Sequence, residues 1–557
     1  MLAAEAVQPG DTAWVLTCAA LVLFMTPGLA LFYAGMVRTR TTLVMLQQNI
    51  IPLGVVSVLW ILLGYSLAFS ADLGGIVGDL ELFGLQGIGD TTPAPAFHTV
   101  EEAVTIPTLA FVAYQMMFAV ITPALITGAT ADRLKFAGWV VFVAAWSLVV
   151  YAPVAHWLWG PDGWLSNMGA QDWAGGMVVH ASAGAAVIAV LLVIGRRRNW
   201  PRTGSLPHSL PITIAGAGIL WFGWFGFNAG DGLQADGIAA QALLNTHIAA
   251  AGAMCVWLIA EKITDGHSTV VGAVSGAVAG LATITPCAGY VNTFAALLIG
   301  AIAGLVCNLA LRLKFAFKLD DALDVLAVHF VGGVVGSVLL GLFASKAVNS
   351  FSADGLFYGG GAGLLGDQAL AVLIVAAFSF CLTWLIAIAI QKTIGLRAAA
   401  ENEDHLDQAQ QGLDAYHLGG ASDLPGTGGT EAGDTEPVGT AAVPAAAHGG
   451  RTKLVTALLD PSLVRADELQ RLLLAGGATS IVVSDAHVRT SAPQPQTLRG
   501  NRQSQEFPGQ LRVEVLVDEA RAQAVAAALS RYSSAAANGY IQTVDPTASP
   551  DDATSAR

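Results

Sequence analysis

The feature that most constrains this chain is a series of eleven apolar stretches, separated by short polar segments, between residues 12 and 391. Most of them are long enough to cross a bilayer as a helix, which takes about 20 residues. Only 12% of the residues are charged, about half the share in a soluble domain. We therefore predict an α-helical integral membrane protein. The predicted spans are 12–36, 43–69, 104–131, 136–158, 174–195, 209–229, 240–261, 269–286 (the shortest), 290–312, 325–344 and 363–391.

The basic residues predict the orientation of these spans. Up to residue 400, every basic residue except Lys346 falls on one side of the predicted spans, and the positive-inside rule assigns that side to the cytoplasm. Eleven spans then place the N-terminus outside and the C-terminus inside a plasma membrane. Residues 1–11 lack the basic start of a signal peptide, so we expect the first span to be retained.

Composition argues against several classes of function. Acidic residues outnumber basic ones 40 to 26, which removes electrostatic support for a nucleic-acid partner. The five cysteines lack metal-ligand spacing, so neither a disulfide framework nor a metal site is expected. No catalytic motif is evident, and we predict no enzyme and no cofactor for transport. Acidic loops on the outer side, whose individual members we expect to be solvated, would concentrate small cations.

Histidines inside predicted spans are functional candidates because polar side chains are costly there, and two of them stand out. His180 lies in the fifth span and His329 in the tenth, and glycines flank both. Either one alone could equally be an interhelical hydrogen-bonding residue. Each histidine ends a block of five spans, and two blocks with an odd number of spans must be related by an inverted repeat. The 5+5 arrangement predicts that the histidines meet at mid-membrane on a substrate path.

Several segments of residues 10–400 together resemble the ammonium transporter family (Amt/Mep/Rh), and they occur in the family's order. The matching segments are GLALFYAGMVR, YQMMFAVITPALITGATADRLKF, AHWLWGPDGWL, DWAGGMVVHASAG, GWFGFNAGDG, GAVSGAVAGLATITPCAGYV and DDALDVLAVHFVGGVVGS. The resemblance implies a homotrimer that moves ammonium or ammonia across the lipid bilayer. The alternative for any single aromatic residue in these segments is ordinary helix packing.

The resemblance also implies roles for individual residues. Trp159, Phe118 and Tyr114 would recruit ammonium at the outer side, and Phe118 with Phe227 would form the pore gate. Aromatic faces hold cations without hydrating them. His180 and His329 would be the pore histidines, which can hydrogen-bond ammonia and relay a proton. Asp172 would be a structural residue near the recruitment site.

Asp231 departs from the family pattern, which has a serine at this position. A carboxylate here either strengthens cation recruitment or points into water. For a partly exposed contact we expect Asp231→Ser to cost on the order of 1 kcal/mol of ammonium affinity.

The region after the spans has a different composition. Residues 401–450 contain nine acidic and no basic side chains, which predicts a flexible linker after a membrane domain of residues 1–400. Hydrophobic patterns within 451–545 predict the strand and helix order β-α-β-β-α-β of a ferredoxin-like α+β domain. Residues 546–557 are expected to be a disordered tail.

The 451–545 segment resembles PII-type signalling proteins, which bind adenine nucleotides and plug ammonium channels. Arg499 and Gly500 match the flexible loop of that family, and Asn538 and Gly539 lie in its phosphate-loop position without the expected lysine. We therefore expect ADP, AMP or cyclic AMP to bind in preference to ATP. The linker, with a reach of roughly 30 Å, would let this domain dock on the cytoplasmic face of its own membrane domain.

Two functions fit these patterns. The first is an ammonium transporter regulated by a fused PII-like domain, and the second is an ammonium sensor that signals through that domain.

Overall fold

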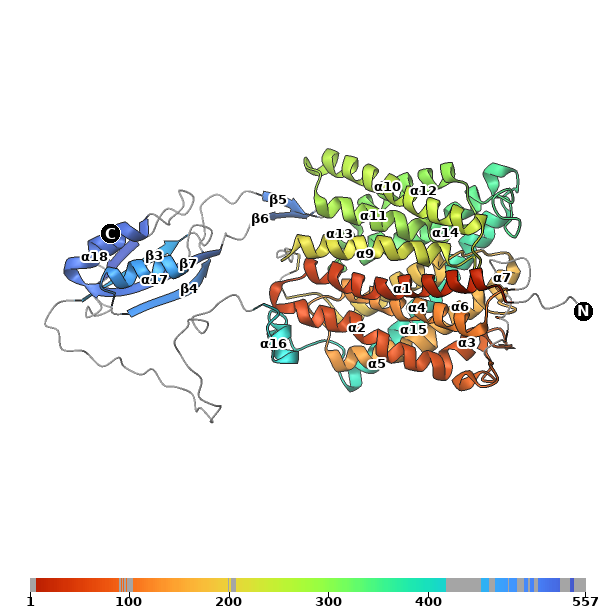
Figure 1. Ribbon diagram of the computed structural model, residues 1–557, viewed down its shortest axis with the longest axis horizontal. Helices are drawn as coiled ribbons and strands as arrows, with labels where there is room; N and C mark the ends of the chain where they lie inside the picture. Colours follow the sequence, from red (N-terminus) through yellow and green to blue (C-terminus); the bar gives the residue numbers. More distant parts are fainter. Residues whose placement is uncertain are drawn as a thin grey trace, which may run out of the picture. The chain divides into compact units, whose positions relative to one another are not determined.

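The computed structural model describes residues 7–89, 92, 94, 97, 104–198, 200–201, 207–416, 452–459, 466–478, 480–487, 495–498, 501–504, 509–530 and 541–544. The chain divides into two compact units, residues 1–420 and 421–557. Each unit has its own hydrophobic core, and each is described by itself below (Figure 1).

Ten helical segments in the described part of the first unit are long and apolar enough to cross a membrane, as predicted. Four of them contain a π-helical turn (η2, η4, η5 or η6), whereas η1, η3, η7 and η8 are 3-10 helices. The first span is α1 (Pro9–Met36), and the second, Thr39–Phe69, contains α2 (Thr42–Leu59), η2 (Trp60–Gly64) and α3 (Tyr65–Phe69). The third is α4 (Thr108–Ala129), and the fourth, Phe136–Met168, contains α5 (Phe136–Trp146), η4 (Ser147–Tyr151), α6 (Ala152–Trp159) and α7 (Trp164–Met168). The fifth, Gly176–Ile194, contains η5 (Gly176–Ala181) and α8 (Ser182–Ile194). The others are α9 (Leu210–Ala229), α10 (Gly237–Asp265), Thr293–Ala316 with α12 (Thr293–Ala310) and α13 (Leu313–Ala316), Leu326–Phe343 with η6 (Leu326–Val331) and α14 (Gly332–Phe343), and α15 (Gly363–Thr393).

The remaining predicted span, 269–286, corresponds to α11 (Val270–Ile284), an apolar helix of 15 residues. At 1.5 Å per residue it is about 22 Å long, shorter than the hydrocarbon layer of about 30 Å. A buried non-helical segment, 285–291, continues from its end. The short elements of this unit are η1 (Thr39–Thr41), β1 (Asp72–Leu73), β2 (Val77–Gly78), η3 (Phe83–Leu85), η7 (Leu356–Tyr358), η8 (Ala400–Asn402) and α16 (Leu406–Gln411).

Glycines allow the helices of the bundle to pack closely. A side chain at Gly28 of α1 would collide with Ile219 of α9, and one at Gly216 of α9 would collide with the backbone of Phe32. Glycines recur every four residues in α11 and face α10, since a side chain at Gly280 would collide with the Ala249 carbonyl. Small residues at helix contacts are the usual way to bring membrane helices together.

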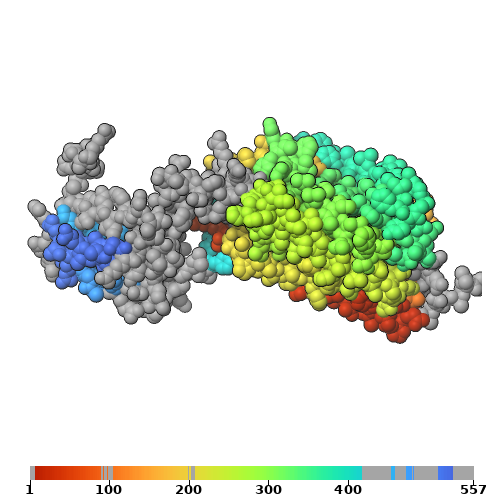
Figure 2. Space-filling model, turned by 90° about the horizontal axis from the view of Figure 1, so that it is seen from above, coloured from red at the N-terminus to blue at the C-terminus, as the bar shows by residue number. Residues whose placement is uncertain are grey.

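Helices of the second half of the bundle form one face of the first unit. In Figure 2 the segments coloured from yellow to green, α9 to α12, cover much of the visible surface. Large apolar side chains on α10 and α12, among them Ile259 and Phe294, are exposed. Exposed apolar side chains on long helices are expected where the surrounding solvent is lipid.

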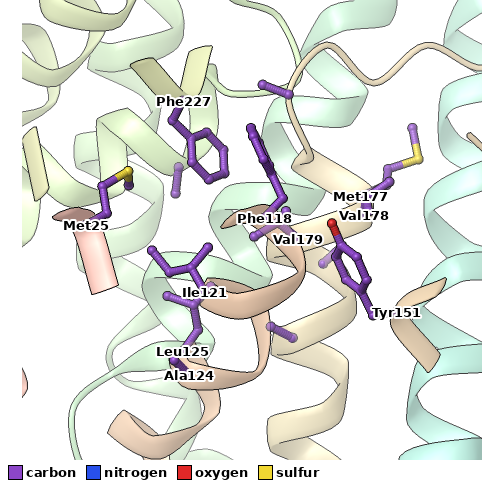
Figure 3. Close-up of a cluster of buried hydrophobic side chains, with 14 of the residues drawn as sticks. Met25, Phe118, Ile121, Ala124, Leu125, Tyr151, Met177, Val178, Val179 and Phe227 are labelled. Carbon is purple, nitrogen blue, oxygen red and sulfur yellow. The ribbon is translucent and has the colours of Figure 1, made fainter. Parts of the chain in front are cut away.

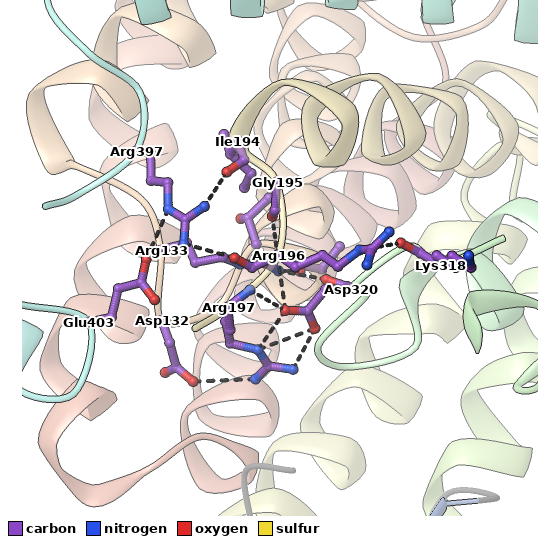
Figure 4. A network of polar contacts seen from close by, with 12 residues as sticks. Asp132, Arg133, Ile194, Gly195, Arg196, Arg197, Lys318, Asp320, Arg397 and Glu403 are labelled. Atoms are coloured by element: carbon purple, nitrogen blue, oxygen red, sulfur yellow. Dashed lines mark hydrogen bonds and ion pairs between the residues drawn. The ribbon is translucent and has the colours of Figure 1, made fainter. Parts of the chain in front are cut away.

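Charged side chains at one end of the bundle, here called the basic end, form a buried network (Figure 4). The Arg133 guanidinium is fully buried, donates to the carbonyls of Gly195 at 2.8 Å and Asp320 at 2.7 Å, and lies 3.4 Å from the Asp320 carboxylate. Arg197 binds the same carboxylate with its Nη2 at 2.7 Å. Burial by itself would raise the pKa of Asp320, but the two arginines lower it below its ordinary value. The network therefore ties three inter-helix loops together.

The segment after α15 is ordered where a flexible linker was predicted. In the predicted linker 401–450, residues up to 416 are described and include η8 and α16, and they belong to the first unit. The carboxylate of Asp407 accepts hydrogen bonds from the backbone N–H groups of Leu43 at 2.9 Å and Val44 at 2.8 Å. It thereby caps the first turn of α2, whose N–H groups have no partner within the helix.

Two further side chains attach this segment to the basic end. The side-chain amide of Gln410 accepts from the N–H of Phe136 at 2.9 Å and donates to the carbonyl of Leu134 at 2.9 Å, so it caps α5. Glu403 pairs with Arg397. Acidic residues of this segment such as Asp407 and Glu403 thus have specific partners. Composition alone does not show these partners, and it therefore predicted a linker.

The second unit contains the predicted order of strands and helices, with an additional hairpin. Its sheet has the order β4-β7-β3-β8, and all neighbouring strands are antiparallel. Val513, Val515 and Val517 are buried on one face, as their alternation predicted. The hairpin β5–β6 lies within the segment 487–508. The elements are β3 (Thr452–Leu459), α17 (Ala466–Ala475), β4 (Ser480–His487), β5 (Pro495–Leu498), β6 (Asn501–Ser504), β7 (Gly509–Asp518), α18 (Glu519–Leu529) and β8 (Ile541–Val544).

The buried network at the basic end generates a first prediction. Replacing Arg133 by alanine leaves the Asp320 carboxylate buried with fewer partners, and breaking a buried ion pair in this way typically costs about 3–5 kcal/mol. We expect Arg133→Ala to lower the midpoint temperature of thermal unfolding in detergent by several degrees. Arg312→Ala, which removes an exposed arginine of the same end, serves as control. Equal midpoints for the two variants would contradict the network's role in stability.

Candidate functional site

Four aromatic side chains that the sequence singled out are brought together at the end of the bundle opposite the basic end. Phe118 and Tyr114 lie one turn apart on α4, Trp159 ends α6, and Phe227 lies on α9. The Trp159 ring lies 5.7 Å from the Phe118 ring at 89°, and the Tyr114 ring lies 5.0 Å from Phe118. The Tyr114 hydroxyl is 3.0 Å from the Phe227 carbonyl. All four side chains are buried.

Phe118, which contacts Trp159, also packs against Phe227. Their ring centroids are 4.3 Å apart at an interplanar angle of 38°. Figure 3 shows the two rings side by side, with Ile121 and Leu125 further along α4. At this separation the rings are in van der Waals contact, so nothing passes between them unless they move.

The two histidines meet directly, as predicted. Nδ1 of His180 and Nδ1 of His329 are 3.2 Å apart, and their rings stack with centroids 5.2 Å apart. One Nδ1 must therefore donate and the other accept, which fixes opposite tautomers for the two neutral rings. In the described part of the chain, Nε2 of His180 has no hydrogen-bond partner. That nitrogen is available to a small molecule.

The histidines line a narrow cavity beneath the phenylalanine pair. Its volume is about 10 Å³, close to the minimum that a single water-sized molecule requires. Besides the two imidazoles, the lining is entirely apolar or aromatic. The lining residues are Met25, Leu29, Phe32, Ile121, Leu125, Val179, His180, Leu220, Trp224, Phe227, Val278 and His329.

Asp172 lies next to this site and organises the backbone around it. Its carbonyl accepts from the Trp159 indole at 2.9 Å. Its carboxylate accepts four backbone N–H bonds, from residues 175–178, at 2.6–3.2 Å. Burial raises the pKa of Asp172 to about 6, although these four N–H groups act in the opposite direction. The carboxylate thus holds the turn that carries His180.

Asp231 is fully buried beside Tyr114, so the alternative that it points into water is wrong, and so is the assumption of a partly exposed contact. Burial raises the pKa of its carboxyl well above the ordinary value. The nearby Asp172 raises it further, whereas hydrogen bonds to Gln115 and Tyr114 act in the opposite direction. Loop acids on this side were expected to be solvated, but Asp172 and Asp231 are both buried.

The sequence prediction missed two contributors to the site. Trp224 stacks on His180 with ring centroids 5.6 Å apart, and its position three residues before Phe227 on the same helix was the available signal. Asp321 accepts from the backbone of the turn that carries His329. Its spacing to His329 equals that of Asp172 to His180, a repeat that was visible in the sequence.

The candidate nucleotide-site residues of the second unit cannot be compared with the structure. Arg499, Gly500, Asn538 and Gly539 all lie outside the described residues. The adenine nucleotide expected there stays a prediction.

Comparison with known proteins gives one family for the first unit. The model of the Ammonium Transporter Family matches residues 13–416. An ammonium transporter of Mycobacterium tuberculosis is 46% identical over 441 residues, which cover 75% of this chain and 92% of the relative.

Solved structures agree with that match. The crystal structure of Candida albicans Mep2 is similar with a TM-score of 0.66 and 32% identity, over 74% of this chain and 94% of the other. A structure described as a sensor Amt protein has a TM-score of 0.64 and 28% identity, over 72% of this chain and 98% of the other. From the family match over residues 13–416 and the identity to its curated members, the chain belongs to the ammonium transporter family.

Proposed function

We propose that this ammonium transporter recruits the ammonium ion at Trp159, Phe118, Tyr114 and Asp231 and admits it through the Phe118–Phe227 pair. Aromatic faces attract a cation, and a buried carboxylate compensates for water that the ion gives up. Because a bare ion in an apolar cavity pays several kcal/mol, the substrate passes the cavity as ammonia. A proton either stays behind or is relayed separately through the histidines. This is transport and not catalysis.

The contact between His180 and His329 is the observation that carries this proposal. Two polar rings, 3.2 Å apart, form the polar part of a cavity that is otherwise apolar and no larger than a water-sized molecule needs. A pair of this kind offers hydrogen bonds to a neutral molecule of that size, whereas it offers no full hydration shell to an ion.

The proposal includes an orientation and an assembly. The basic end would face the cytoplasm by the positive-inside rule, which places Trp159 on the outer side of a plasma membrane, the N-terminus outside and the C-terminus inside. The transporter would be a homotrimer, as the family resemblance implies. Spans 1–5 and 6–10 would be an inverted repeat, and the mutual glycine packing of α1 and α9, the first helix of each block, supports this.

For the second unit we propose a ferredoxin-like regulatory domain related to PII proteins. Its β-α-β-β-α-β order and the sheet order β4-β7-β3-β8 support this fold. The domain would bind ADP, AMP or cyclic AMP and dock on the cytoplasmic face of the transporter. The second candidate function is an ammonium sensor that signals through this domain, favoured by the similarity of the membrane unit to a sensor Amt protein.

The histidine pair generates the second prediction. We expect His180→Ala and His329→Ala each to disrupt selective ammonium uptake into proteoliposomes, because each removes half of the polar lining of the cavity. His247→Ala is the matched control, since His247 is an exposed histidine on the spanning helix α10. Wild-type uptake and selectivity in both pore variants, with intact assemblies by size-exclusion chromatography, would contradict the pore assignment.

A third prediction concerns Asp231. Removing one partner of a buried charge pair costs at least about 2 kcal/mol, so Asp231→Ser should raise the half-saturation concentration for ammonium roughly thirty-fold. Asp162→Asn, which removes an exposed acid of the same end, is the control and should leave the half-saturation concentration unchanged.

The pH dependence of the same variants checks the mechanism. Because the pKa of Asp231 is raised, protons compete with ammonium, and the wild-type half-saturation concentration should rise as the pH falls. Asp231→Ser should show a flatter profile. Identical profiles for wild type and variant would show that the carboxylate does not bind the ion.

The fourth prediction tests the second unit. We expect isolated residues 451–557 to bind ADP, AMP or cyclic AMP more tightly than ATP in titration calorimetry, because the phosphate-loop position lacks the expected lysine. Tightest binding of ATP would reverse this order. If the isolated domain binds no adenine nucleotide, nucleotide binding is refuted and a role in docking on protein remains for the second unit.

A further inference from the structure

Two segments of the membrane unit repeat one pattern of three residues. Asp172 precedes His180 by eight residues, and Gly184 follows it by four. Asp321 precedes His329 by eight residues, and Gly333 follows it by four. Each histidine lies in a π-helical turn, η5 or η6, at the start of the span. The repeat therefore covers an acid, a turn and a glycine.

The two carboxylates share two equivalent backbone contacts. Asp172 accepts from the N–H groups four and five residues later at 2.6 and 2.8 Å. Asp321 accepts from the N–H groups four and five residues later, those of Val325 at 3.1 Å and Leu326 at 2.8 Å. These N–H groups begin the helix and have no acceptor within it. Each carboxylate thus anchors the first turn of the segment that carries a histidine.

The two glycines make reciprocal contacts. A Cβ on Gly184 would lie 2.4 Å from the Cβ of Phe330, the residue after His329. A Cβ on Gly333 would lie 2.9 Å from the backbone nitrogen of Ala181, the residue after His180, and 2.8 Å from the Cβ of His180. Each turn therefore packs against the glycine of the other, and this close approach brings the imidazoles together.

The anchors lie at opposite ends of the bundle. Asp172 contacts Trp159, whereas Asp321 follows Asp320, which belongs to the network of the basic end. Both carboxylates are nearly fully buried. The two turns enter the bundle from opposite ends and meet at the histidines.

We propose that Asp321 is a positioning residue for His329, as the inward counterpart of Asp172 for His180; this inference rests on the proposed role of the histidine pair. Asp321 touches no substrate. It fixes the height and rotation of η6 and so the position of the His329 imidazole. Since the two Nδ1 atoms are 3.2 Å apart, a displacement of about 1 Å is enough to break their hydrogen bond.

Asp324 provides a matched control in the same loop. It is a buried acid three residues after Asp321, but its carboxylate pairs with the ammonium group of Lys314. Asp324→Asn therefore removes the charged partner of Lys314, while Asp321 and its two contacts with the backbone at the start of η6 stay in place.

The test measures His329 directly in the full-length protein. Nitrogen-15 magnetic resonance of histidine-labelled protein in lipid, with the His329 signals identified by their loss in His329→Ala, compares wild type, Asp321→Asn and Asp324→Asn. We expect Asp321→Asn to shift the His329 ring signals and Asp324→Asn to leave them in place. We also expect Asp321→Asn to lower the maximal ammonium flux at least about tenfold, with an unchanged half-saturation concentration on the Trp159 side.

Unshifted His329 signals in Asp321→Asn, or equal shifts in both variants, would overturn the proposal. If Asp321→Asn does not assemble, Asp321→Ser replaces it, because serine keeps one capping acceptor and removes the charge; the same outcomes apply. Normal transport by His329→Ala would refute the proposed function, while the signals of Asp321→Asn would still decide whether Asp321 positions that ring.

Discussion

Polar groups that a membrane bundle buries must find their partners inside the protein, because lipid offers none. In this transporter, carboxylates solve that problem at the starts of helical turns. The carboxylate of Asp172 accepts hydrogen bonds from the first N–H groups of η5. Asp321 does the same at the start of η6, and Asp407 at the start of α2. Under our proposal the positions of His180 and His329 depend on this arrangement, since each imidazole lies in a turn whose first N–H groups are held by a carboxylate.

The site combines a closed entrance with a very small cavity. Phe118 and Phe227 are in contact, so nothing passes between the rings unless they move apart. The buried acid Asp231 lies beside Tyr114, where our proposal places the recruited cation. Under our proposal, charge is handled on the Trp159 side of the phenylalanine pair and a neutral molecule crosses the cavity, which would allow an apolar cavity to serve a charged substrate.

Sequence patterns predicted the spans, the histidine contact and the order of strands in the second unit, because long apolar runs and alternating valines report directly on burial. They failed where one composition serves two structures. The acids after residue 400 resemble those of a solvated linker, yet Asp407 caps α2. Asp231 in a loop resembles a solvated acid, yet it is buried. Burial of a single carboxylate depends on partners that are distant in sequence, and periodicity carries no information about them.

The docking of α16 has a consequence for the segment that joins the two units. Asp407 and Gln410 together occupy three backbone N–H groups at the starts of α2 and α5. The chain leads from these residues into the second unit. Any event there that detached α16 would strip two spanning helices of their caps, at a cost of about 1 kcal/mol for each cap. By linkage, the same free energy resists detachment, so the state of the spans and the attachment of the tail influence each other equally.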